Sequence, residues 1–408
     1  MGEPARSAQL AGGPEIRIES ASVLPNGHVQ VGLTLSRGGA RLSRAEAVAL
    51  KPTFTLAMLS THPVDGLAAW QSLLLTGGQT AAQLPPAGPF TPPGQVIANA
   101  RQPGVETSGT FDGDDGAFTY EFATPLPAGF LPTATFRAAV YLSAAEGTAR
   151  TNATFDFRPA GGSPAPRDTV LDANCNRCHG TLRAHGGRRV GVKICLTCHT
   201  WQNSDPDTID PAAPDGATAA TNPNPLELGR LVHRIHRGKN LPTLYQAAPG
   251  GSAVPAPPLP SATALPLPFS PSRTGGATPA NPPLAGRKFS VIGYQSREFV
   301  FGRVVSRSDN QQPPRLVPTG VVFPRDLRDC EACHGGAPQE SEVLYAVSRR
   351  TCHGCHPDTW FDATPIADPV HFAHAGGPQV DETGCAGCHV SEAPPQKLYA
   401  PIAEIHVP

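Results

Sequence analysis

The first part of the chain alternates between apolar and polar residues. Ile16 and Ile18 open this pattern, an Asn26–Gly27 dipeptide follows, and apolar residues return at every second position from Val29 to Leu35. A period of two places successive side chains on opposite faces of a strand, and Asn-Gly favours a tight hairpin turn. The sequence therefore predicts a β-hairpin in this segment.

Several later segments repeat the alternation. Their apolar residues are Phe54, Leu56, Met58, Phe118, Tyr120, Phe122, Phe136, Ala138, Val140, Leu142, Ala153, Phe155 and Phe157. Turns separate these segments, and we interpret the acidic turn at 112–116 as a hairpin tip rather than a calcium site. About seven short strands with turns between them are typical of a β-sandwich or split barrel. We predict such an all-β fold, with Greek key-like connections, for residues 13–158.

The regular alternation ends there, and the domain organisation follows from this change. Residues 159–168 combine prolines with glycines, which predicts a stiff linker. Residues 169–408 show no long periodic segments, so we expect a coil-rich domain with short helices. Together, 47 prolines and 42 glycines make long helices unfavourable across the chain.

Three segments of this second domain have a recognisable pattern. Apolar residues at helical spacing predict a helix over 226–237, which Gly238 ends. Eleven prolines mark 247–286 as a low-complexity insertion. A short hairpin is predicted within 289–305.

The cysteines follow one motif without exception. The chain contains five copies of C-x-x-C-H, and they hold all ten of its cysteines: Cys175, Cys178, Cys195, Cys198, Cys330, Cys333, Cys352, Cys355, Cys385 and Cys388. C-x-x-C-H is the attachment signature of c-type haem, in which two thiols bind the porphyrin edge and the histidine binds iron. The sequence therefore predicts five covalently bound haem c groups, and no cysteine remains for a disulfide.

A zinc interpretation of the same cysteines is weaker. The spacing between the first two pairs, and between the third and fourth, fits a four-cysteine zinc site. That interpretation leaves the fifth pair without a partner, however, and it does not explain why a histidine follows every pair. We therefore prefer haem.

The histidines supply both axial ligands in this prediction. The proximal ligands are the motif histidines His179, His199, His334, His356 and His389. The predicted distal ligands are His185, His233, His236, His374 and His406, with His353 and His371 in reserve. The chain has only two methionines, Met1 and Met58, so bis-His haems of low potential are expected.

Spacing favours particular distal histidines. His233 and His236 lie three positions apart on the predicted helix, so they project to one side and would serve two different haems. His185 follows His179 by six residues, and an extended chain of that length covers about 20 Å, which barely rounds a haem edge. We therefore expect His185 to bind the iron of a neighbouring haem. His28 and His62 are expected to be surface residues.

Net charge and hydropathy restrict the class of protein and its cellular location. A net charge of −1 is not typical of a nucleic-acid-binding protein. No apolar segment is long enough to cross a membrane as a helix. The first residues do not form a signal peptide, and haem attachment of this kind takes place outside the cytoplasm. We expect a mature extracytoplasmic form, in the periplasm or at the outer membrane and cell surface.

Four stretches of the second part of the chain carry a family resemblance: Cys175–Arg188, Val232–Pro242, Val321–Cys330 and Ile402–His406. Through these stretches and the order of the five motifs, this part resembles the OmcA/MtrC-type outer-membrane multihaem cytochromes. The resemblance implies a β-domain ahead of a pentahaem module, and bis-His ligands at positions that match His185, His233, His236 and His406. That family usually carries two such modules, whereas this chain has one, and the insertion at 247–286 is not part of its pattern.

These observations predict an electron-transfer protein rather than an enzyme, although it could also reduce metals or shuttles without specificity. Expected partners are periplasmic or outer-membrane cytochromes, minerals or soluble shuttles. Two alternatives stay open. One is a nitrite- or hydroxylamine-type oxidoreductase with one open haem, and the other is a subunit that self-associates into a conducting filament.

Overall fold

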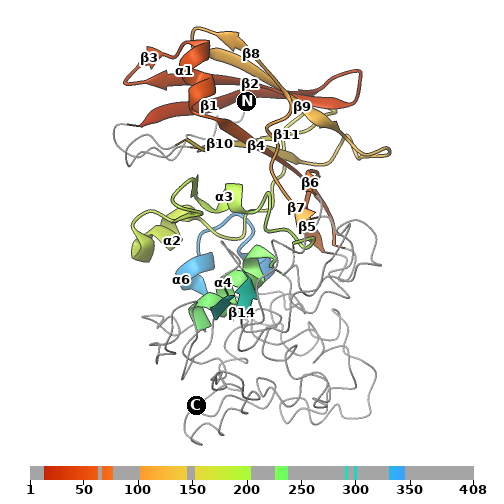
Figure 1. Ribbon diagram of the computed structural model, residues 1–408. Coiled ribbons are helices and arrows are strands. Elements are labelled where there is room, and N and C mark those ends of the chain that lie inside the picture. The colour runs from red at the N-terminus through yellow and green to blue at the C-terminus, as the bar shows by residue number, and fades with distance from the viewer. Residues whose placement is uncertain are drawn as a thin grey trace, which may run out of the picture. The chain divides into compact units, whose positions relative to one another are not determined.

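The structure is a computed structural model that describes residues 13–62, 67–76, 102–144, 152–203, 226–237, 290–292, 298–300 and 330–344. The chain forms two compact units (Figure 1). The described residues up to Asn203 belong to the first unit, and those from 226 onward belong to the second. The predicted linker at 159–168 thus lies inside the first unit, while the division into two domains stays a prediction.

The first sheet of the first unit contains the predicted N-terminal hairpin. Its strands are β1 (Pro14–Val23), β2 (His28–Arg37), β3 (Ala40–Arg41), β8 (Thr110–Asp114) and β9 (Ala117–Pro125). They are ordered β1-β2-β9-β8, with β3 also paired to β2. Because β9 pairs with β2 and not only with β8, the chain makes the crossover expected of a Greek key-like fold.

The second sheet has the order β11-β10-β4-β5. Its strands are β4 (Pro52–Thr61), β5 (Ala68–Ser72), β10 (Phe136–Leu142) and β11 (Asn152–Phe157). A small ladder of β6 (Leu75–Thr76) with β7 (Gln102–Pro103) and the helix α1 (Arg44–Ala49) complete the β-region. Strand β1 contacts β11 and brings the sheets together along one side, so the predicted sandwich is confirmed.

The core between the sheets consists of the residues that the period-two pattern selects. Ile16, Val31, Phe54, Tyr120 and Phe136 are all at most 1 % exposed. The side chains of Phe54 and Tyr120 stack across the two sheets, and burial raises the pKa of the Tyr120 phenol. Met58, which the sequence excluded as an iron ligand, also belongs to this core.

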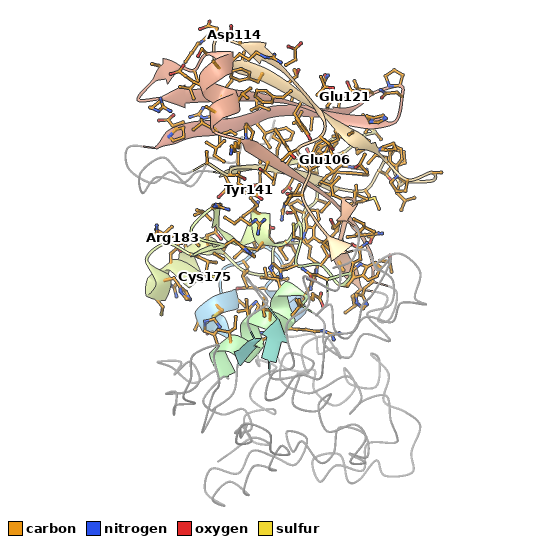
Figure 2. All side chains as sticks on the ribbon, viewed as in Figure 1. Glu106, Asp114, Glu121, Tyr141, Cys175 and Arg183 are labelled. Atoms are coloured by element: carbon orange, nitrogen blue, oxygen red, sulfur yellow. The ribbon has the colours of Figure 1, made fainter. Side chains whose placement is uncertain are left out.

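Glu106 is a buried carboxylate that ties the two sheets together (Figure 2). It accepts hydrogen bonds from the Tyr120 hydroxyl at 3.0 Å, from the backbone of Ala123 at 2.7 Å, and from both the backbone and hydroxyl of Thr124. Its own backbone pairs with Phe54 of the other sheet. One carboxylate, itself 6 % exposed, therefore satisfies four donors of the first sheet.

Glu106→Ala is expected to lower the free energy of unfolding of the β-region by about 3 kcal/mol, because it leaves the buried Tyr120 hydroxyl and three part-buried donors without an acceptor. Urea unfolding followed by circular dichroism measures this loss. Glu121→Ala, at a less buried position of the neighbouring strand β9, is the control and is expected to change stability by less than about 0.5 kcal/mol. Equal effects of the two substitutions would contradict the assigned role of Glu106.

The cysteine-rich segments form short elements, as predicted. The first unit contains α2 (Asp172–His179), β12 (Arg183–Ala184), β13 (Arg189–Val190) and α3 (Val192–Cys195). The second unit contains α4 (Leu228–Arg237), β14 (Ser290–Ile292), β15 (Glu298–Val300), α6 (Glu331–His334) and α7 (Ser341–Leu344). Strands β14 and β15 pair antiparallel, which confirms the hairpin predicted within 289–305.

No helix among the described residues is long and apolar enough to span a membrane.

Candidate functional site

The C-x-x-C-H motifs that the structure describes lie on single turns of helix. The first motif is in α2, the second begins at the end of α3, and the third includes α6. In the second and third motifs the histidine N–H donates to the carbonyl of the first cysteine, His199 to Cys195 and His334 to Cys330, each at 2.9 Å. Residues at i, i+3 and i+4 share one face of a helix, so both thiols and the imidazole project to the same side.

The second motif is built onto the outer face of the second sheet. Ile194 of α3 is 1 % exposed and packs against Ala139 and Tyr141 of β10. The side-chain amide of Asn152 in β11 exchanges two hydrogen bonds with the backbone of Val190, at 2.8 and 3.1 Å. These contacts position the turn that carries Cys195.

Two more hydrogen bonds continue this contact beyond the motif. The Thr197 hydroxyl donates to the hydroxyl of Thr55 in β4 at 2.8 Å, and the Gln202 side chain accepts from the backbone of Ser72 in β5 at 2.7 Å. All of the side chains involved are buried. The sheet therefore holds the second motif from both ends.

A network of four charged residues crosses the same contact. Arg137 of β10 is fully buried and binds Asp156 through two nitrogen atoms, at 2.6 and 2.9 Å. Its guanidinium also lies 3.4 Å from Asp168, and Lys193 of α3 lies 3.1 Å from the other oxygen of that carboxylate. The Trp70 ring covers the guanidinium at 4.2 Å. The charges of two cations and two carboxylates thus balance beneath the second motif.

The imidazoles of His185 and His199 face each other beside the second motif. Their ring centres are 6.0 Å apart and the ring planes are inclined by 32°. His185 has a φ of 52°, a left-handed conformation that is uncommon for a residue other than glycine. Gly186 and Gly187 follow it with positive φ as well. The chain thus makes a tight left-handed turn that brings His185 toward His199.

A second pair has nearly the same geometry in the second unit. The ring centres of His233, on α4, and His334, in the third motif, are 6.2 Å apart at an inclination of 47°. A metal–imidazole bond is about 2.0 Å long and the ring centre lies about 1.1 Å beyond the nitrogen, so two imidazoles on opposite sides of one metal have centres about 6.2 Å apart. Both pairs fit an iron held between them.

The two non-motif histidines of these pairs are uncharged at neutral pH. Desolvation lowers the pKa of His185 to about 4, helped by the charges of Arg189 and His199, although the residue as a whole keeps contact with solvent. Burial lowers the pKa of His233 to about 4 as well, with His334 and His236 contributing. A histidine binds a metal in its neutral form.

His236 is one turn beyond Val232 on α4, and its Nδ1 lies 2.8 Å from the carbonyl oxygen of that residue. Donation to this carbonyl keeps the proton on Nδ1 and leaves Nε2 as the nitrogen suited to bind a metal.

The other predicted site residues are placed as follows. His179 is the last residue of α2. The remaining predicted site residues, Cys352, Cys355, Cys385, Cys388, His356, His374, His389 and His406, lie outside the described residues, as does the insertion at 247–286.

None of the six described cysteines forms a disulfide. Burial raises the pKa of the Cys195 thiol to about 12 and also raises that of Cys198. Within the described part of the chain, no group of three or more His, Cys, Asp or Glu side chains is arranged to hold a metal ion by itself.

Two other interpretations of the sequence have a clear outcome. The acidic turn is the tip of the β8–β9 hairpin, as predicted, and its carboxylates Asp112 and Asp115 bind Arg44 and Arg41. The interpretation of His62 as a surface residue was wrong. It is 2 % exposed because Trp201, which follows the second motif, packs against it edge to face.

Sequence reasoning missed the residues that support the second motif from the sheet. Arg137, Asn152 and Tyr141 belong to the face of the second sheet that the period-two pattern assigns to the polar side. Arg189, which stacks on Tyr141, was missed too. For Arg137 and Tyr141 the signal is the uninterrupted set of seven buried positions in β10, which is visible only in the structure.

Comparison with known proteins gives one family match. Residues 167–399 match the family model described as outer membrane cytochrome MtrC/MtrF-like, domains II/IV. A comparison with curated protein sequences gave no match.

Solved structures with a similar fold belong to longer chains. The crystal structure of the outer membrane decaheme cytochrome OmcA aligns with a TM-score of 0.55 and 20 % identity, over 94 % of this chain and 47 % of that one. The structure of MtrC from Shewanella baltica OS185 aligns with a TM-score of 0.46 and 17 % identity, over 92 % and 43 %. The chain thus spans about half the length of these proteins.

Proposed function

Because the chain belongs to the MtrC/MtrF-like family of outer membrane cytochromes, we propose that it carries electrons through five haem c groups, each bound to one C-x-x-C-H motif. Membership of this family means that the protein works outside the cytoplasm, at the cell surface. Bound haem iron supplies one-electron redox chemistry, and this chain holds, orients and insulates it.

The observation that carries the proposal is the spacing of the two imidazole pairs. Each pair joins one motif histidine to one histidine from elsewhere in the chain, at 6.0 Å for His199 with His185 and 6.2 Å for His334 with His233. We therefore assign His185 as the distal ligand of the second haem and His233 as that of the third. The first of these pairs agrees with the expectation that His185 serves a haem other than that of His179.

The other three haems take their distal ligands from the remaining predicted histidines in this proposal. Those distal ligands are His236, His374 and His406, and the proximal ligands of these three haems are His179, His356 and His389. Because His236 lies one turn from His233 on α4, it would bring a further haem next to the third one. Short separations between neighbouring haems are what a chain of electron carriers requires.

The histidine side chains affect the haems in two ways, through their reduction potential and through their coordination. Imidazole on both sides of an iron lacks the potential-raising effect of an axial methionine, so the haems are of low potential. Six-coordinate irons also leave no position for a substrate, which argues for electron transfer over nitrite or hydroxylamine chemistry. We propose other cytochromes, minerals or soluble shuttles as redox partners.

Substitution of the distal ligands tests this function. The purified protein is expected to contain five haems per chain and only low-spin iron. His185→Ala and His233→Ala are each expected to convert one haem to high-spin iron, visible by electron paramagnetic resonance, without changing the number of attached haems.

His28→Ala is the matched control, because His28 binds the carbonyl of Phe122 in the β-region and contacts neither pair. Its spectrum is expected to equal that of the unaltered protein. A purely low-spin spectrum for His233→Ala would show that the pairing is wrong. High-spin iron in the unaltered protein would favour an oxidoreductase with an open haem.

A further inference from the structure

His185 lies in the turn of a small hairpin that joins the first two motifs. The two strands of this hairpin, β12 and β13, pair antiparallel. The hairpin follows α2, which carries the first motif, and leads directly into α3, where the second motif begins. Because His185 faces His199 of the second motif, the position of the hairpin sets the distance between the two imidazoles.

Two side chains of α2 hold the base of this hairpin. Just before β12, the backbone N–H of Leu182 donates to Oδ1 of Asn176 at 2.7 Å. Just after β13, the backbone N–H of Val192 donates to Oδ1 of Asp172 at 2.7 Å. The N–H of Gly191 donates to the Leu182 carbonyl at 3.0 Å and closes the base between these two points. The helix of the first motif therefore holds the hairpin at both of its ends.

Gly191 allows the Asp172 carboxylate to come this close to the backbone. It has a φ of 84°, in the left-handed region that favours glycine. A Cβ atom at this position would lie 2.5 Å from Oδ2 of Asp172, closer than van der Waals contact permits. Any side chain at position 191 would therefore displace the carboxylate from the hairpin.

The second sheet holds the hairpin from its other side. Asn152 of β11 exchanges two hydrogen bonds with the backbone of Val190, and Nη2 of Arg189 donates to the hydroxyl of Tyr141 in β10 at 3.1 Å (Figure 2). The base of the hairpin is thus fixed between the sheet and the first motif, and the turn with His185 extends from this support.

We propose that Asp172 and Asn176 are positioning residues for His185, so that the helix carrying the first pair of haem-binding cysteines holds the distal ligand of the second haem in place. This inference rests on the proposed function, because it takes His185 as that ligand. Loss of either hydrogen bond allows the hairpin to move, and His185 then leaves the iron more often. Carbon monoxide binds only when His185 has left, so its apparent affinity follows the open fraction.

The test is a carbon monoxide titration of the reduced, full-length, haem-loaded protein, followed by visible absorption. In Asp172→Ala, and separately in Asn176→Ala, the apparent dissociation constant of one haem in five is expected to fall about fivefold, the factor for one hydrogen bond of ordinary net strength. Asp172→Asn keeps an acceptor at Oδ1 and is expected to restore the original constant. Arg177→Ala, at an exposed position of the same motif, is the matched control and is expected to change nothing.

His185→Ala identifies the haem concerned, because it opens one iron completely. Adding Asp172→Ala to this variant is expected to leave the number and affinity of the carbon monoxide sites unchanged. A second open haem in the double variant, or unchanged affinity in both Asp172→Ala and Asn176→Ala with five haems attached, overturns the proposal. If His185→Ala opens no haem, the pairing in the proposed function fails instead.

Gly191→Ala decides where an alanine variant of α2 attaches fewer than five haems. It displaces the Asp172 carboxylate without altering α2 or any motif, so the same dissociation constant is expected to fall. An unchanged constant in Gly191→Ala contradicts the positioning role.

Discussion

Arg137→Met is expected to destabilise the first unit by about 3–5 kcal/mol, because removing one member of a buried ion pair leaves uncompensated charge. Methionine keeps much of the volume and the contact with Trp70. Two carboxylates, Asp156 and Asp168, would then lose the buried guanidinium and keep the ion pair with Lys193, and both are only 13 % exposed. Urea unfolding followed by circular dichroism measures the loss.

Lys193→Met is the control for this network. Lys193 is 42 % exposed and approaches the same carboxylates from the solvent side, so its removal is expected to lower stability by less than about 1 kcal/mol. Similar losses from the two substitutions would mean that the network contributes through its surface charges and not through the buried guanidinium.

Removal of the second haem is expected to weaken the β-sheet itself. In the double variant Cys195→Ala, Cys198→Ala, the protein should carry four haems, and the opening free energy of the β10 amides should fall by at least about 3 kcal/mol. This magnitude is that of deleting a large buried aromatic group, and the haem is larger still. Hydrogen exchange of the backbone amides measures the opening directly.

The third motif offers a matched comparison. Cys330→Ala, Cys333→Ala also removes one haem, but from the second compact unit. The amides of β10 are expected to keep their protection in this variant. Equal loss of protection in both double variants would show that any missing haem destabilises the whole protein, so the close packing of the second motif on the sheet would have no special role.

The comparison of sequence with structure is clearest in strand β10. The alternation of Phe136, Ala138, Val140 and Leu142 predicts one buried face correctly, because period-two patterns report which side of a strand meets a core. The other face carries Arg137, Ala139 and Tyr141 and reads as solvent-facing. It is buried as well, since the second motif packs on it. No local sequence pattern predicts that the second motif, some fifty residues further along the chain, covers this face of β10.

The histidines also show that local sequence patterns do not predict long-range contacts. Sequence spacing predicts His199 and His334 as ligands, because a motif histidine follows its cysteines on one helical turn. His185 and His233 could be named as candidates but not assigned to an iron. The turn at His185–Gly187 decides the first pairing, and the approach of α4 to the third motif decides the second.

The sequence by itself determined the sandwich and predicts five sites of haem attachment with their proximal ligands, because these depend on local periodicity and on fixed covalent spacing. Only the tertiary structure decided that His185 faces His199 and His233 faces His334, that Arg189 meets Tyr141, and that the sheet supports the second motif. Such contacts join residues far apart in the chain, and long-range packing, which has no local signature, selects them.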